Sequence, residues 1–148
     1  MRLEYHILWF EDSDRYISSF KPLIEKYLAD LYFKPSFTIK PDDSGLEDIM
    51  KKWDIDLILV DYNLEDELKG DKLLGIIRSH QLYTEAVFYS QIANIEKQMQ
   101  ERLEGVYLAT GMDIYDKVRK IINLTIKKSQ DFPSIRGLFI AETIDMIK

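Results

Sequence analysis

The segment "DLILVDYNLEDELKG" (56–70) decides the fold class, because an unbroken apolar run in it ends on a single aspartate, Asp61. The run at 57–60 has no polar alternation, which is typical of a strand that is covered on both faces in a parallel sheet. An aspartate directly after such a strand is either a turn former or a carboxylate displayed for chemistry. The remaining segments help to distinguish these two interpretations.

Apolar segments that predict strands alternate along the chain with segments of helical spacing. Strands are expected at 5–10, 36–40, 56–61, 85–91 and 106–110. Helices are expected at 14–28, 46–53, 71–81, 94–105 and 113–130. This alternation predicts an α/β domain with a parallel sheet and helices on both faces. Right-handed crossovers then bring the carboxyl ends of all the strands to one edge, where ligands of such sheets bind.

The first helix carries two features that the sequence leaves open. Ser13 or Asp14 can cap its amino end, because both side chains accept hydrogen bonds from backbone N–H groups. Pro22 falls within the apolar periodicity of the helix. A proline at this position either kinks the helix or marks a later start.

Composition restricts the classes of function. The 148 residues suit one compact domain, which we assign to residues 1–130. The net charge of −6 without a basic stripe argues against nucleic-acid binding. The absence of cysteine excludes disulfides and thiolate metal sites. No apolar run approaches the ~20 residues of a membrane span, so we expect a cytoplasmic protein without membrane insertion.

Residues 131–148 exceed the alternating pattern and predict a C-terminal helical extension. Pro133 suits a helix start, and Ile135, Leu138 and Met146 share one side of the helix. An apolar helix of this kind packs on the domain, pairs with a second subunit, or links to a further domain. The sequence leaves these three arrangements open.

Acidic residues follow two of the predicted strands at the common edge. Glu11 and Asp12 come after the first strand, and Asp61 ends the third. Packed carboxylates repel one another, so a cluster of them usually needs a cation. Oxygen ligands without His or Cys favour Mg²⁺ over zinc. A carboxylate beside Mg²⁺ can attack a phosphoryl group, and a nearby hydroxyl can bind the phosphoryl oxygens.

Structural interpretations of the same residues stand beside the chemical ones. Asp61 could form a turn, and Glu11 with Asp12 could stabilise the dipole of the following helix. Ser90 ends the fourth strand, where serine is common, and Tyr107 on the fifth strand could be a packing residue. The two acidic segments strengthen each other's chemical interpretation, because the predicted topology brings them together.

At this point the chain resembles the receiver domain of response regulators, the flavodoxin-like module of two-component signalling. The resemblance covers about residues 4–128 and depends on the order and spacing of four segments. These are "ILWFEDSD" (7–14), "DLILVDYNLEDELKGDKLLGIIR" (56–78), "AVFYSQ" (86–91) and "GVYLAT" (105–110). The resemblance implies a doubly wound parallel sheet of five strands in the order 2-1-3-4-5.

The resemblance also implies a role for each residue at the sheet edge. Asp61 would be the phosphoacceptor. Mg²⁺ would be held by Glu11, Asp12, Asp61 and the backbone carbonyl of Asn63. Ser90 matches the switch hydroxyl of the family, and Tyr107 matches its switch aromatic residue.

One position departs clearly from the family pattern. The lysine that usually follows the fifth strand, often with a proline after it, falls on Thr110 and Gly111. The family lysine pairs with the phosphoryl oxygens, so its absence leaves one positive charge missing beside the carboxylates. Lys69 is a candidate substitute in the loop. In that loop Glu65 occupies the position of the usual proline.

Two functions follow from the resemblance. In the first, a sensor histidine kinase or a small phosphodonor phosphorylates Asp61 with Mg²⁺, and the domain switches its contacts with an output domain, an output protein or a second copy. In the second, the domain is a degenerate receiver that binds partners without phosphorylation. Neither makes the chain a classical enzyme. A phosphohydrolase is disfavoured because Asn63 replaces the second aspartate that such an enzyme would use.

Overall fold

The computed structural model describes residues 3–42, 44–52, 54–61, 84–90 and 105–131, together with Gly75 and Arg78. Within these ranges, five strands form one parallel sheet in the order β2-β1-β3-β4-β5. The strands are β1 (Leu3–Phe10), β2 (Phe33–Lys40), β3 (Leu57–Asp61), β4 (Ala86–Ser90) and β5 (Val106–Thr110). The predicted fold class and strand order are therefore confirmed.

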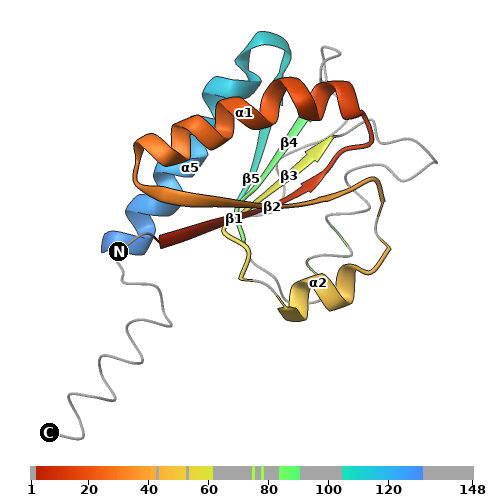
Figure 1. Cartoon of the computed structure of the whole chain (residues 1–148), viewed down its shortest axis with the longest axis horizontal. Coiled ribbons are helices and arrows are strands. Elements are labelled where there is room, and N and C mark those ends of the chain that lie inside the picture. Colours follow the sequence, from red (N-terminus) through yellow and green to blue (C-terminus); the bar gives the residue numbers. More distant parts are fainter. Residues whose placement is uncertain are drawn as a thin grey trace, which may run out of the picture.

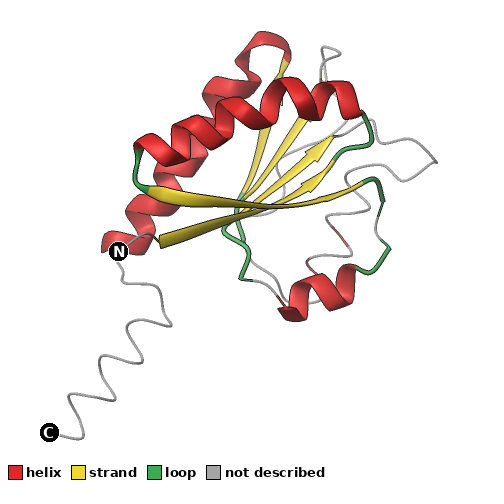
Figure 2. Cartoon of the chain, viewed as in Figure 1, coloured by secondary structure: helices red, strands yellow, loops and turns green. Residues whose placement is uncertain are grey.

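Helices cover both faces of this sheet. The long helices α1 (Asp14–Asp30) and α5 (Ile114–Asp131) lie together on one face, and the short helix α2 (Leu46–Lys52) lies on the other (Figure 1). Figure 2 shows the strands enclosed between these layers. The helices predicted at 71–81 and 94–105, and the extension at 131–148, lie almost entirely outside the described residues. No helix within the described ranges is long and apolar enough to cross a membrane.

Strand alternation divides the core into two layers, because neighbouring side chains point to opposite faces of the sheet. One layer lies toward α1 and α5 and includes Trp9, Leu59 and Tyr89. The other layer includes Phe10 and Phe88 and packs with residues of α2. Both layers continue to the carboxyl end of the strands, so side chains at that end are supported by the packed core beneath them.

The structure of α1 shows which residue caps the helix and where the helix begins. Ser13 is the N-cap, and its hydroxyl oxygen accepts the backbone N–H of Tyr16 at 3.2 Å. The helix begins at Asp14 and includes Pro22, so the later start considered for Pro22 is wrong. At the other end, Tyr32 has a left-handed backbone with φ of 67° and is 83% exposed.

Strand β2 begins at Phe33, three residues before the predicted start at Ser36. The added residues include Pro35, which normally argues against a strand because it has no N–H to donate. Since β2 lies at the edge of the sheet, only one of its sides pairs with a neighbour, and the proline is tolerated there. The edge position therefore explains why the sequence pattern set the start of this strand too late.

Candidate functional site

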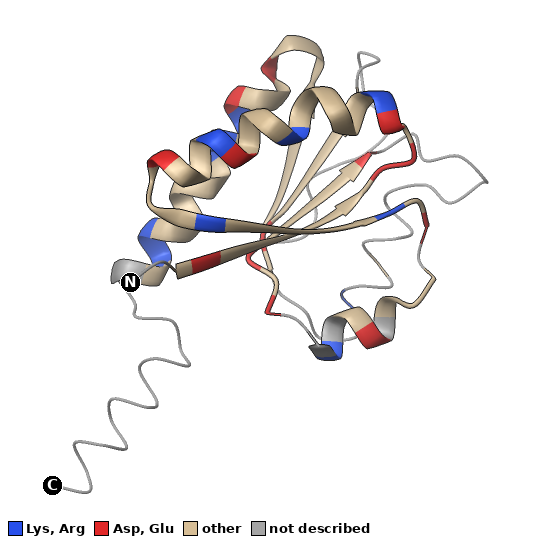
Figure 3. Cartoon of the chain, viewed as in Figure 1, with Lys and Arg blue, Asp and Glu red and all other residues tan. Residues whose placement is uncertain are grey.

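Three carboxylates meet at the carboxyl end of the sheet. One oxygen each of Glu11, Asp12 and Asp61 lies within 4.8 Å of the others. Figure 3 shows acidic positions in the loop between β1 and α1 and at the tip of β3. Glu11 is only 3% exposed, and the other two side chains are half-buried. The expected convergence of these acids is confirmed, while their role in binding a metal stays a prediction.

The register of the central strands explains this convergence. Phe10 on β1 pairs with Val60 on β3, so the next residues, Glu11 and Asp61, leave neighbouring strands side by side. The backbone N–H of Glu11 also donates to the carbonyl of Lys40 at 3.0 Å, which fixes the start of the loop after β1. The site therefore follows directly from parallel pairing of two apolar strands that both end in an acid.

Hydrogen bonds hold the Glu11 carboxylate on both oxygens. Its Oε2 accepts the backbone N–H groups of Asp12 and Ser13, each at 3.0 Å. Its Oε1 accepts the hydroxyl of Tyr89 at 2.5 Å. The oxygen of that hydroxyl in turn accepts the indole N–H of Trp9 at 2.8 Å. Groups of the chain itself therefore fix the orientation of the Glu11 carboxylate.

The electrostatics of the cluster are unfavourable to negative charge. Burial raises the pKa of Glu11 to about 7. The hydrogen bonds from Tyr89 and Ser13 oppose this rise, whereas the charge of Asp61 and its side-chain hydrogen bond to Glu11 add to it. Burial, followed by the charges of Glu11 and Asp61, also raises the pKa of the Tyr16 phenol. The field of the carboxylates therefore reaches the first turn of α1.

The donor set suits a hard divalent cation. All the available ligand atoms are carboxylate oxygens, and the described residues bring no His or Cys to the cluster. A cation between the carboxylates would offset the repulsion that contributes to the raised pKa of Glu11. Oxygen donors of this kind fit Mg²⁺. Asn63, whose carbonyl was predicted to complete the site, lies outside the described residues.

The other predicted site residues lie on β4 and β5. Ser90 is fully buried at the end of β4 and pairs across the sheet with Thr110. Tyr107 is partly buried, and the ammonium of Lys117 lies 5.9 Å from the centre of its ring. Thr110 ends β5 at the usual lysine position, and Gly111 follows it with φ of 56°. Their switch roles stay predictions.

Tyr89 is the site residue that the sequence analysis missed. It pairs with Asp61 across β3 and β4, and its hydroxyl contacts Glu11. Within the strand "AVFYS" a tyrosine has the pattern of ordinary core packing. The contact with Glu11 depends on the strand register and on the rotamer of the ring, so the sequence pattern carries no signal that separates Tyr89 from a packing residue.

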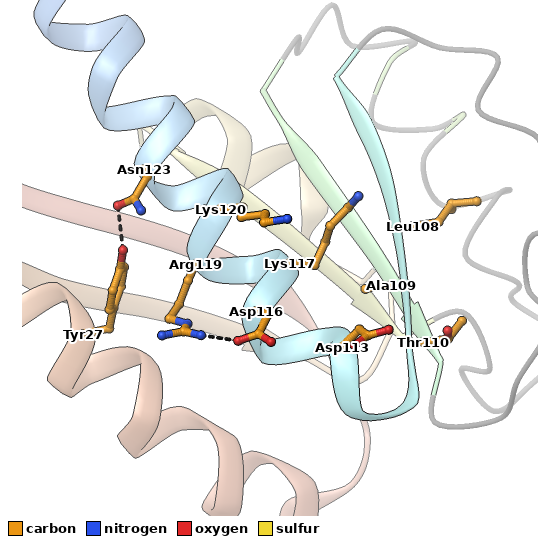
Figure 4. A pocket seen from close by; sticks show the side chains of 10 residues that line it. All are labelled: Tyr27, Leu108, Ala109, Thr110, Asp113, Asp116, Lys117, Arg119, Lys120 and Asn123. Atoms are coloured by element: carbon orange, nitrogen blue, oxygen red, sulfur yellow. Dashed lines mark hydrogen bonds and ion pairs between the residues drawn. The ribbon is translucent and has the colours of Figure 1, made fainter.

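A separate groove of about 610 Å³ lies along β5 and α5, and Glu11, Asp12 and Asp61 are not among the residues that line it. Its lining includes Lys117, Arg119 and Lys120, and Figure 4 shows Arg119 turned toward Asp116, with which it forms an ion pair. Thr110 also lines it, at the end of β5. The groove therefore joins a basic stretch of α5 to the strand that carries the predicted aromatic switch.

No family model and no curated protein matches the sequence. Solved structures do match the fold. A response regulator receiver protein from Sinorhizobium medicae is 14% identical with a TM-score of 0.62, over 84% of this chain and 95% of its own. A signal receiver domain from Pseudomonas fluorescens is 14% identical with a TM-score of 0.61, over 88% and 95%.

A third match is the receiver domain of the PhyR response regulator from Erythrobacter litoralis. It is 19% identical with a TM-score of 0.60, over 84% of this chain and 91% of its own. At such low identities the likeness establishes the architecture and not the chemistry. The chain therefore has the flavodoxin-like fold of response-regulator receiver domains.

Proposed function

We propose that the chain is a signal receiver that accepts a phosphoryl group on Asp61. The observation that carries this proposal is the meeting of three carboxylates within 4.8 Å at the carboxyl end of a receiver-type sheet. Ligands of doubly wound sheets bind at this end. A turn or dipole function for the acids does not require them to meet, so the convergence favours a site.

The chain's part in the transfer is that of a nucleophile. One carboxylate oxygen of Asp61 forms a bond to phosphorus as the bond between phosphorus and the donor's leaving atom breaks. The bonding electron pair leaves with the donor. It leaves on an imidazole nitrogen that takes up a proton if the donor is a phosphohistidine, or on the carboxylate oxygen of acetate if the donor is acetyl phosphate. Asp61 is half-buried and ends β3, at the edge of the sheet where ligands of this fold bind.

Glu11, Asp12 and Asp61 would hold Mg²⁺, together with the carbonyl of Asn63 that the resemblance implies. When bound, the cation supplies positive charge for the phosphoryl oxygens, which is the charge that Thr110 does not supply. Glu11 keeps its orientation through Tyr89 and the backbone amides, so it is positioned before a cation arrives.

Phosphorylation would act as a switch through the adjacent strands. Added charge at Asp61 would draw in the hydroxyl of Ser90, and Tyr107 would change its packing on β5. The groove along α5, with Lys117 beside Tyr107, lies where such a change would alter a partner surface. A kinase upstream and an output protein, output domain or second copy downstream are the partners that this function requires.

Mass spectrometry tests the proposal directly. The protein is incubated with Mg²⁺ and acetyl phosphate, and we expect one phosphoryl group to add to the wild type. The adduct should be absent from Asp61→Asn and from samples with EDTA. Asp30→Asn, on the exposed end of α1, changes charge equally and should keep the adduct. An unmodified wild type, or an adduct that survives Asp61→Asn, contradicts the proposal.

A second function is favoured by a different observation. Tyr89 and two backbone amides already satisfy Glu11, and no lysine follows β5 at Thr110 or Gly111, so the site is held together without a phosphoryl group or its usual cationic partner. The domain would then bind partners or dimerise independently of phosphorylation. Sedimentation with and without Mg²⁺ and beryllofluoride tests the case of self-association, because only the first function allows these ligands to change it.

A further inference from the structure

Tyr89 lies at the centre of the site without a role in the proposed chemistry. Its ring is 2% exposed and packs edge-on against Tyr16, with centroids 5.3 Å apart. Its hydroxyl lies between two groups of opposite hydrogen-bonding character, the indole of Trp9 and the carboxylate of Glu11. A buried hydroxyl needs a hydrogen-bond partner, and the partner that accepts the Tyr89 proton is a carboxylate of the acidic cluster.

The indole determines the direction of the hydroxyl proton. The Trp9 N–H can only donate, so the 2.8 Å contact uses a lone pair of the Tyr89 oxygen. The phenol proton is therefore left for Glu11 Oε1, 2.5 Å away. Trp9 from β1 and Tyr89 from β4 thus form a buried chain of two donors that ends on a carboxylate oxygen of Glu11, just after β1.

Counting the lone pairs of the Glu11 carboxylate shows how it is held. An ionised carboxylate offers roughly four acceptor sites, two on each oxygen. The amides of Asp12 and Ser13 use the two sites of Oε2, and Tyr89 uses one site of Oε1. A carboxylate oxygen of Glu11 also lies within 4.8 Å of one of Asp61, and a side-chain hydrogen bond between the two residues helps to raise the pKa of Glu11.

We propose that Tyr89, oriented by Trp9, is a positioning residue that fixes the Glu11 carboxylate beside Asp61, in the orientation in which the two carboxylates would hold a divalent cation. The inference rests on the proposed function, because it assigns Tyr89 a part in the metal site of that function. Removal of the hydroxyl frees the Oε1 end of Glu11 to rotate, although the aromatic packing is kept. Outer partners that orient metal ligands typically change metal affinity about 10–100-fold when they are lost.

Calorimetric titration of the full chain with MgCl₂ tests this role. We expect Tyr89→Phe to weaken Mg²⁺ binding about 10–100-fold. Trp9→Phe should weaken it less, because the hydroxyl is kept and only its orientation is lost. Tyr5→Phe is the matched control: Tyr5 is equally buried and hydrogen-bonded, but its partner is Thr125, and its Mg²⁺ affinity should equal that of the wild type.

Fluorescence gives a readout that a purely structural role would not change. The chain has two tryptophans, so Trp53→Phe leaves Trp9 as the single indole. Binding of Mg²⁺ at Glu11 should then alter Trp9 emission through Tyr89, and saturating Mg²⁺ should leave the emission unchanged in Trp53→Phe/Tyr89→Phe. If Tyr89→Phe does not fold, Trp9→Phe still tests the relay by calorimetry.

The outcomes separate the inference from the function on which it rests. A wild type that binds no Mg²⁺ contradicts the metal site itself, and the inference with it. A wild type that binds, together with a Tyr89→Phe variant of equal or higher affinity, overturns the inference alone. Higher affinity would mean that the hydroxyl competes with the cation for Glu11, and equal affinity would mean that Tyr89 serves only the fold.

Discussion

Tyr5 and Tyr89 belong to the same buried layer, but they lie at opposite ends of the sheet. Near the start of β1, the Tyr5 hydroxyl contacts the Thr125 hydroxyl at 2.7 Å, and Thr125 donates to the carbonyl of Ile122. Near the end of β4, the Tyr89 hydroxyl donates to the carboxylate of Glu11. The Tyr5 hydroxyl thus meets a neutral partner, whereas the Tyr89 hydroxyl meets a titratable carboxylate inside the core. Burial alone does not separate these two tyrosines, but their partners do.

The largest difference between the two ends should be their response to pH. Glu11 has a folded pKa of about 7 against an ordinary value of 4.5, so the folded state holds its proton more tightly. Its contribution to stability is present below about pH 4.5 and is lost as pH rises through about 7. Since one pKa unit corresponds to about 1.4 kcal/mol, the loss is on the order of 3 kcal/mol. Urea unfolding in EDTA across this range measures it.

His6, toward the amino end, acts with the opposite sign. Burial lowers its pKa below the ordinary 6.5, so its contribution to stability is lost as pH falls. His6→Gln removes this effect and should leave the decline with rising pH alone. Stability that is flat or increases between about pH 5 and pH 8 in that variant contradicts the raised pKa of Glu11.

The next largest effect should come from Tyr89→Phe. The substitution leaves the Glu11 Oε1 atom and the Trp9 N–H without their shared partner in a buried place. A hydrogen bond to a charged group is worth about 1.5–3 kcal/mol, so we expect unfolding to become easier by about 2 kcal/mol at pH 8. Urea unfolding should show a lower midpoint with an unchanged m-value.

Tyr5→Phe should cost less, although the side chain is just as buried. Its lost hydrogen bond joins two neutral hydroxyls, and Thr125 keeps its bond to the Ile122 carbonyl. A neutral bond contributes about 1 kcal/mol, so the unfolding free energy should fall by that amount at every pH. A cost equal to or larger than that of Tyr89→Phe would remove the proposed contrast between the two ends of the sheet.

The smallest effect is expected for an exposed charge pair remote from both tyrosines. Asp116 and Arg119 form an ion pair on α5, and their side chains are 61% and 40% exposed. Exposed pairs contribute about 0.5 kcal/mol or less, so Asp116→Asn should hardly change thermal unfolding. A loss comparable to that of Tyr5→Phe would show that surface charges on α5 matter more to stability than its core contacts suggest.

The strands of the sheet could be predicted from the sequence because each central strand is an apolar run with clear ends. The meeting of Glu11 with Asp61 also followed from topology, since parallel strands end on one edge. The contact between Tyr89 and Glu11 could not be predicted in this way. It depends on the register that pairs Tyr89 with Asp61 and on the rotamer of one ring, and neither is encoded in periodicity.

The predicted starts of two elements were wrong because the position in the fold overrides the local sequence preference there. Pro35 lies in β2 only because that strand is at the edge of the sheet. The helix expected from Asp113 begins at Ile114, because Gly111 takes a left-handed backbone and leads into a short 3₁₀ turn, Gly111–Asp113. Short turns of this kind leave no periodic signal in the sequence.

Pro35 has a consequence for how copies of this domain can associate. An edge strand offers unpaired backbone groups to any passing chain, and proteins blunt such edges with proline and lysine. Here β2 carries the exposed Lys34 beside Pro35 and ends on Lys40. A foreign strand aligned along β2 would find no backbone N–H at Pro35 and would meet the ammonium groups of Lys34 and Lys40. A continuous β-sheet between molecules is therefore disfavoured at this edge.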